Sequence, residues 1–325
     1  DVTAEQANTV LSAYGRLWVA DTATNKTTVW WSDLLDGTNF ATGSAGSIDI
    51  SSILVKGNDE IVALGAQVGR LVVFCKNNVV IFSDNDGDSV LDPISMRLVE
   101  VIEGVGCVAR DSVQNTGTDI IFLSSQGLMS LGRLIQEKSQ PMRDLSKNVR
   151  DTLVADVNNA TPSNIRSVYS SIDAFYLLLV PEYRRVYCFD MRSMLQDGSS
   201  RVTLWDNQTQ NNMLYADSRL LFQGTDGVSD YYGYQDLGNS YVLKYFTNYF
   251  DFGDATNIKI LKRLGATFIG GSGQEIILKA GYDYSNNYRQ YRTTLSNFSN
   301  SEYNVDEYGI AVYSAGVLVD QVRAP

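Results

Sequence analysis

Residues 118–132, TDIIFLSSQGLMSLG, have the pattern of two short strands joined by a tight turn. An apolar run at 120–123 is followed by turn-forming residues at 124–127, and apolar residues resume at Leu128. A single hairpin cannot bury its apolar side in water. The fold therefore depends on whether this unit is repeated along the chain.

Similar units recur through most of the sequence, at 15–32, 69–84, 118–132, 173–190, 218–234 and 265–283. Their first strands start 44 to 56 residues apart, as marked by Leu17, Leu71, Ile120, Tyr176, Leu220 and Thr267. Even spacing of this kind with short strands is typical of propeller blades. The pattern predicts an all-β fold, a β-propeller of about six short-stranded blades over residues 1–281. A large sandwich or barrel with evenly spaced hairpins is the alternative.

One segment has a helical period. In PMRDLSKNVRDTLVADV, residues 141–157, Leu145, Val149 and Leu153 recur every four residues. This spacing predicts one short helix inserted between the third and fourth blades, with Leu145 and Val149 facing the propeller. Residues 282–325 are rich in Tyr and Asn. We expect them to form C-terminal strands that close the propeller or make an intersubunit contact.

The composition restricts the class of protein. With 44% hydrophobic and 19% charged residues, the 325-residue chain is expected to fold. No apolar run is long enough to cross a bilayer, so no membrane span is predicted. The net charge of −11, without a basic block, speaks against tight nucleic-acid binding. The chain begins at Asp1 without a methionine, which suggests a processed product or part of a longer polypeptide.

The sequence offers little for catalysis. It contains no histidine, which removes Ser-His-Asp and Cys-His nucleophiles and every histidine metal site. The GxSxG elbow, the Walker A loop and the GxGxxG fingerprint are missing. The cysteines Cys75, Cys107 and Cys188 are widely spaced, and we expect buried free thiols made in a reducing compartment. We predict no catalytic residue, no cofactor and no enzymatic activity.

Two acidic patterns are candidate sites. Asp84, Asp86 and Asp88 are spaced like the start of a calcium loop, but Gly87 is the fourth residue and the glutamate expected at position twelve is missing. We interpret this segment as a turn and predict no metal site, while the sequence leaves cation binding by Asp84–Asp88 open. A glycosidase would use paired carboxylates. Neither SDNDGD nor GTDGVSD matches the spacing of a sialidase-type Asp-box.

Aromatic residues suggest both core and surface roles. Trp30 and Trp31 are adjacent, so one side chain of a strand should point inward and the other outward. Tyrosine is enriched at interfaces and in strands alike. The C-terminal tyrosines are therefore candidates for a binding surface or for edge-strand packing: Tyr282, Tyr284, Tyr288, Tyr291, Tyr303 and Tyr308.

The order of segments resembles a known family. The segments are GRLWVADTATNKTTVWWSDLLDGTNF, IVALGAQVGRLVVFCKNNVVIFS, EGVGCVARDSV, GTDIIFLSSQGLMSL, MRDLSKNVRDTL, FYLLLVPEYRRVYCFDMR, LLFQGTDGVSDYYGY and IKILKRLGATFIGG. Over about residues 15–280, the chain resembles the tail nozzle, or DNA-stabilisation hub protein, of short-tailed (podovirus-type) bacteriophages. Members of that family are commonly longer than this chain.

The resemblance implies a structural role without catalytic residues. It implies a homo-oligomeric ring, as a hexamer, attached below the portal–adaptor complex in the virion tail, with tail fibres as further partners. The protein would be made in the cytoplasm of the bacterial host, and DNA would pass through the lumen without sequence-specific binding. An acidic lumen would repel phosphates over a Debye length of about 8–10 Å. A glycan-binding or glycan-cleaving propeller and a generic protein-interaction propeller are the alternatives.

Overall fold

The protein is described here from a computed structural model, which covers residues 6–54, 59–84, 90–137, 144–225, 227–232, 241–247, 250, 253, 260, 264–269, 274–282, 285, 287–295 and 319–324. The chain divides into two compact units, Asp1–Ser240 and Tyr241–Pro325.

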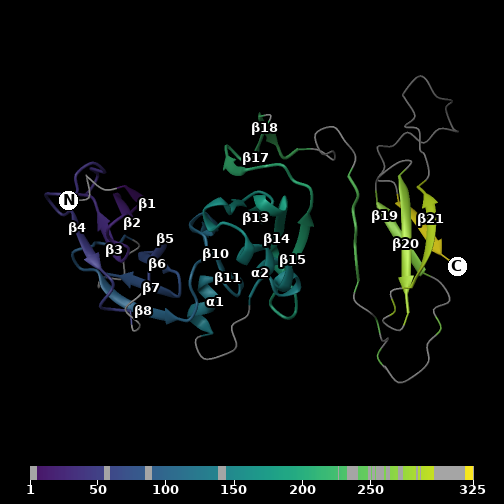
Figure 1. The fold of residues 1–325 in the computed structure, drawn as a ribbon, viewed down its shortest axis with the longest axis horizontal. Coiled ribbons are helices and arrows are strands. Elements are labelled where there is room, and N and C mark those ends of the chain that lie inside the picture. The colour runs from purple at the N-terminus through teal and green to yellow at the C-terminus, as the bar shows by residue number, and fades with distance from the viewer. Residues whose placement is uncertain are drawn as a thin grey trace. The chain divides into compact units, whose positions relative to one another are not determined.

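The first unit is built from antiparallel sheets that follow one another along the chain (Figure 1). The first sheet has the order β1-β2-β3-β4, with bounds Ala7–Ala13, Arg16–Thr22, Thr28–Trp31 and Gly46–Asp49. The second is β5-β6-β7-β8: Ile61–Gln67, Arg70–Cys75, Asn78–Ser83 and Arg97–Glu103. The third is β9-β10-β11: Gln114–Asn115, Ile120–Ser124 and Gly127–Ser130.

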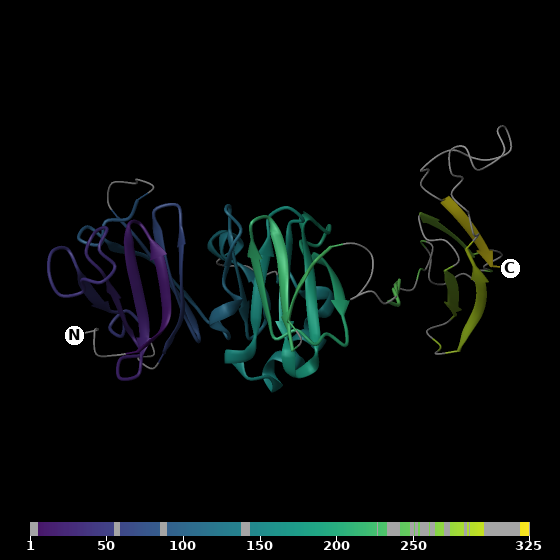
Figure 2. The same ribbon diagram turned by 90° about the horizontal axis from the view of Figure 1, so that it is seen from above.

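Two further sheets complete the described part of this unit. The fourth is β12-β13-β14-β15, with bounds Arg166–Ser170, Phe175–Val180, Arg185–Met194 and Ser200–Trp205, and its long strands lie side by side in teal in Figure 2. The fifth is β16-β17-β18: Asn212–Ala216, Arg219–Gly224 and Gly227–Asp230. Every sheet is a meander in which strands pair with their sequence neighbours.

The first strands of successive sheets lie against one another. β1 contacts β5, β5 contacts β9, β9 contacts β12, and β12 contacts β16. Consecutive meanders that meet through their first strands have the architecture of propeller blades. The predicted all-β fold of propeller type is confirmed, and the described residues of this unit hold five successive blades.

The repeated hairpins correspond to the second and third strands of the blades. In the stretch 118–132, β10 pairs with β11 so that Leu123 faces Leu128. The turn requires a glycine at Gly127, which has φ of 132°, and a Cβ there would lie 2.4 Å from Ser146 Oγ. The first five predicted hairpins are confirmed.

The sixth predicted hairpin, residues 265–283, is wrong. Its two strands, β19 (Leu264–Ile269) and β20 (Glu275–Gly281), belong to different two-stranded sheets of the second unit. β19 pairs with β22 (Val319–Ala324), and β20 pairs with β21 (Tyr288–Thr294). Alternating apolar residues predict a strand but do not identify its partner, and here both partners come from the Tyr- and Asn-rich C-terminal part.

The apolar cores lie between successive blades. The first and second blades enclose Trp18, Trp31 and Phe82, with the two indole rings 5.6 Å apart. Further clusters join the second blade to the third, the third to the fourth, and the fourth to the fifth. Trp31 is buried while Trp30 is half-buried, which confirms the predicted division of this pair between the two faces of its strand.

The predicted helix is present but begins later than the periodicity suggested. Helix α2 spans Arg150–Asn159, and Leu145 lies in the turn before it, buried in the same cluster as Leu153. A short helix α1, Leu131–Gln136, was not predicted, and the Ser130 side chain caps it by accepting from the Arg133 amide. The 3-10 turns are η2 (Arg110–Ser112), η3 (Lys147–Val149), η4 (Pro162–Asn164) and η5 (Pro181–Tyr183). Among the described helices, none has the length and hydropathy that a bilayer span requires.

Candidate functional site

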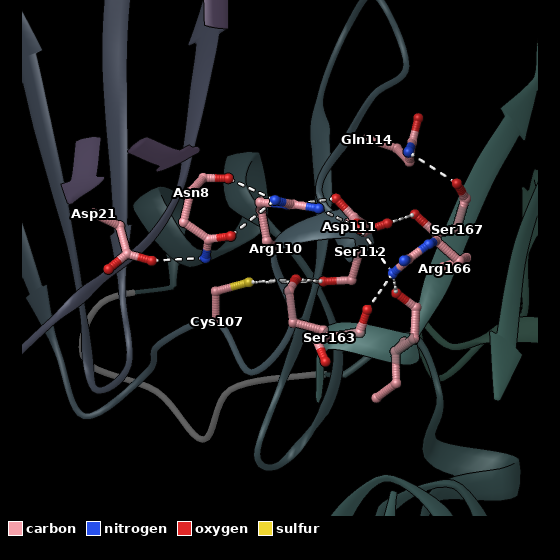
Figure 3. Close-up of polar contacts among 12 residues, drawn as sticks. Asn8, Asp21, Cys107, Arg110, Asp111, Ser112, Gln114, Ser163, Arg166 and Ser167 are labelled. Atoms are coloured by element: carbon pink, nitrogen blue, oxygen red, sulfur yellow. Dashed lines mark hydrogen bonds and ion pairs between the residues drawn. The ribbon is translucent and has the colours of Figure 1, made fainter. Parts of the chain in front are cut away.

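A cluster of polar residues joins three blades near their first strands (Figure 3). Arg110, in the turn η2 that leads into the third blade, donates to the carbonyl oxygen of Asn8 in β1 at 2.5 Å and to its side-chain oxygen at 3.0 Å. The same guanidinium donates hydrogen bonds to both carboxylate oxygens of Asp111, at 2.7 and 2.9 Å. The first and third blades are thereby tied by a charged hydrogen-bonded contact.

The cluster continues into the fourth blade through Asp111. Arg166, at the start of β12, lies 2.8 Å from the Asp111 carboxylate, so this carboxylate forms ion pairs with both Arg110 and Arg166. The Ser167 hydroxyl donates to the Asp111 carbonyl at 2.7 Å, and the Gln114 side chain donates to the Ser167 carbonyl at 3.1 Å. The Tyr176 hydroxyl, fully buried, donates to the Ser112 carbonyl at 2.6 Å.

The charges of this cluster are paired. The hydrogen bond to Asp111 raises the pKa of Arg110, so the guanidinium stays charged. Asp21 is 2.7 Å from both the Lys26 ammonium and the Asn8 amide nitrogen. A general acid or nucleophile must be free to meet a substrate. The observed arrangement instead has the properties of a structural tie between blades.

A second polar cluster attaches helix α2 to the fourth blade. The buried Asp156 carboxylate accepts from Arg185 Nη1 at 2.8 Å and from the Tyr187 hydroxyl at 2.6 Å. Burial, followed by the hydrogen bond to Asp156, raises the pKa of Tyr187. The tyrosine is therefore a neutral donor at physiological pH, and it does not act as a base.

The candidate cation site at Asp84–Asp88 lies only partly within the described residues. Asp84 is buried, and its Oδ2 accepts from the Asp92 amide at 3.2 Å. Asp86 and Asp88 lie outside the described residues, and the interpretation of this segment as a turn stays a prediction. Within the described ranges, no group of three or more Cys, Asp or Glu side chains is arranged to hold a metal ion.

The three thiols are free and buried, as predicted. Desolvation raises the pKa of Cys107 and of Cys188 from 9.0 to about 12. A thiol with so high a pKa holds almost no thiolate at neutral pH and is a poor nucleophile. We therefore assign these cysteines to the core.

The C-terminal tyrosines are exposed where they are described. Tyr282, Tyr288 and Tyr291 are 39%, 53% and 36% exposed. Tyr284, Tyr303 and Tyr308 lie outside the described residues. The exposed three are compatible with a contact surface, which stays a prediction.

Sequence reasoning missed both polar clusters. Asn8 and Arg110 are 102 residues apart, and Asp156 and Arg185 are 29 apart. Separations of this size carry no periodic signal, because they depend on which blades become neighbours. The one available hint was the charged pair Arg110–Asp111 directly after a buried segment.

No protein-family model matches the chain, and no curated protein matches it. Among solved structures, the AfRom2 CNH domain is similar at 11% identity and a TM-score of 0.39, over 90% of this chain and 82% of that one. Kluyvelomyces marxianus Hsv2 is similar at 9% identity and a TM-score of 0.38, over 88% and 84% of the two chains. PorZ of Porphyromonas gingivalis is similar at 13% identity and a TM-score of 0.34, over 89% of this chain and 33% of PorZ.

Similarities this weak do not identify a family. The blade geometry itself defines the class: this is a β-propeller protein whose described polar clusters hold blades and a helix together.

Proposed function

We propose that the chain is a structural component of a phage tail tube, a nozzle or hub attached below the portal–adaptor complex. It would help form the channel through which the genome is retained and ejected. The observation that carries this proposal is the ordered series of segments that resembles the tail nozzle family. Five of those segments contain strand pairs of successive blades, from β2–β3 to β17–β18.

The polar clusters support a role without catalysis. Arg110, Arg166 and Asp156 are engaged within the protein, where they strengthen contacts between blades and with helix α2. A tail component must keep its shape while DNA moves past it. Internally paired charges serve that need, since they remove groups that would otherwise bind a ligand.

The net charge also suits a channel for DNA. A ring of six copies would carry roughly six times the chain's charge of −11, and phosphates within about one Debye length of the walls would be repelled. DNA would then slide without being held in one register. The partners of this proposal are further copies of the chain, the portal–adaptor complex and tail fibres, in the virion.

The test is cryo-electron microscopy of the recombinant chain mixed with portal and adaptor proteins, or of a purified virion tail. We expect a ring of propellers around a lumen wide enough for duplex DNA, on the far side of the adaptor. A monomer that does not bind the portal complex would refute the proposal. A carboxylate-lined pocket in that monomer, with activity on host polysaccharide, would support a glycan-cleaving propeller instead.

A further inference from the structure

An exposed, largely apolar segment begins the second unit. Residues 241–247, YVLKYFT, form neither helix nor strand, and their large side chains are exposed. Tyr245 is 86% exposed and Phe246 84%, while Val242 and Leu243 are close to 80%. Tyr, Val, Phe and Thr are strong strand formers. Such a segment, left uncovered, is a site for pairing with another chain.

The exposed area is large enough to matter for assembly. An aromatic side chain buries about 150–250 Å² when covered. Tyr241, Tyr245 and Phe246 are 61%, 86% and 84% exposed, so together they offer on the order of 400 Å², and Val242 and Leu243 add to this. An equal area on the surface that receives them brings the contact to the ~1,000 Å² expected of a specific interface.

The fifth blade offers an edge to receive such a strand. The first, second and fourth sheets have four strands, whereas the third and fifth have three, and the fifth has the order β16-β17-β18. β16 lies against β12 of the fourth blade, so β18 is the outer strand. Among the described residues, no strand pairs with the free edge of β18. Val228 in β18 is 69% exposed, which adds an apolar side chain at this edge.

We propose that residues 241–247 of one copy add to β18 of a second copy as the fourth strand of its fifth blade. Strand addition supplies main-chain hydrogen bonds along the edge, while alternate side chains supply apolar contacts. Each copy gives one strand and receives one, through two different surfaces. Contacts of this heterologous kind close into a ring when the rotation allows it.

The local charges at the two surfaces allow contact between copies of the same chain. Copies with a net charge of −11 repel one another, so contact needs a local surface without negative charge. The one charged residue of the segment is Lys244, which is positive. Asp230, at the end of the receiving strand β18, is paired with Arg219, so its negative charge is already compensated. The inference rests on the proposed function for the ring, whereas the two surfaces come from the described residues.

The test is disulfide cross-linking between two single-cysteine variants. Val228→Cys is mixed in equal amounts with Val242→Cys or with Leu243→Cys, two neighbouring positions that sample both strand faces, under mild oxidation. A disulfide needs Cα atoms within about 7 Å. The native thiols are buried and do not compete. We expect a covalent dimer in one of the mixtures and none from Val228→Cys alone.

Two results would overturn this inference. One is the absence of a dimer in both mixtures. The other is an internally cross-linked monomer when both cysteines are in one chain, which would mean that the segment folds back on its own blade. A ring on the portal complex without these cross-links would refute the strand addition and leave the tail role intact. Cross-linked oligomers that do not bind the portal complex would support the strand addition and refute the tail role.

A charge substitution gives an independent check. Phe246→Asp introduces a charge into the proposed contact, and we expect at least a tenfold loss of oligomer at equal concentration. Leu35→Asp is the matched control, because Leu35 is 86% exposed in the first blade. It should leave assembly unchanged. Equal assembly by both variants would count against the proposed strand exchange.

Discussion

Replacing Asp156 with alanine is expected to weaken the first unit markedly. The carboxylate is buried and accepts from Arg185 Nη1 at 2.8 Å and from the Tyr187 hydroxyl at 2.6 Å. The substitution leaves a buried hydroxyl without its acceptor and a guanidinium without its strongest partner. Both losses occur where helix α2 meets the fourth blade.

The expected loss is about 3 kcal/mol in the free energy of unfolding. Removing one partner of a buried ion pair costs about 3–5 kcal/mol. Arg185 is 31% exposed, so water replaces part of that pairing and lowers the cost. Tyr187 is fully buried, and an unsatisfied buried hydroxyl costs about 1–3 kcal/mol.

Asp206→Ala is the matched control, because Asp206 contacts the same arginine at 3.3 Å while its side chain is 58% exposed. Exposed pairs are worth about 0–1 kcal/mol. Urea unfolding followed by tryptophan fluorescence measures both variants, since all four tryptophans belong to the first unit. Equal losses in the two variants would refute the assignment of Asp156 as the main tie. A Tyr187→Phe background should reduce the effect of Asp156→Ala, because the two changes remove one shared contact.

Three further predictions concern the blades. Gly106→Ala should destabilise the protein by several kcal/mol in thermal unfolding, because the new Cβ would lie 2.1 Å from the Lys76 carbonyl oxygen. Gly104→Ala is the control: Gly104 has φ of 77° and open space around it, and the substitution should cost about 1 kcal/mol. The cysteine thiols should stay unreactive towards a thiol reagent at pH 8 until the protein is unfolded. The pKa values of Cys107 and Cys188 are raised in the folded protein, so the unfolded chain loses these thiol protons first as the pH rises. The contribution of these buried thiols to the free energy of unfolding is therefore fully present below pH 9 and is lost between about pH 9 and 12. Arg110→Ala should cost about 1–2 kcal/mol in urea unfolding, because it removes the hydrogen bonds to Asn8 and the pair with Asp111.

The sequence predicted blades because a hairpin is a local structure. In 69–84 and 118–132, apolar runs and turn residues lie within a few positions of each other, so strand and turn are both visible. Leu145 and Leu153 likewise marked a helix by their spacing. The exact start of α2 was missed, since residues 147–149 form a 3-10 turn that shares the same spacing.

What the sequence did not predict depends on distant partners. Nothing near β20 shows that it pairs with β21 rather than with β19. The Arg110–Asn8 contact spans 102 residues and exists only once the first and third blades are neighbours. Pairing and contact of this kind follow from tertiary structure, and no local pattern records them.

The long separation between Asn8 and Arg110 has a consequence for the order of folding. Each blade hairpin closes a loop of a few residues, which is fast, whereas the Arg110–Asn8 contact closes a loop of 102 residues. Closing so long a loop loses more chain entropy than closing a hairpin. The contact should therefore form late, after the second blade has brought the two ends together. Protection of the amides near Arg110 would then mark the moment at which the first three blades have assembled.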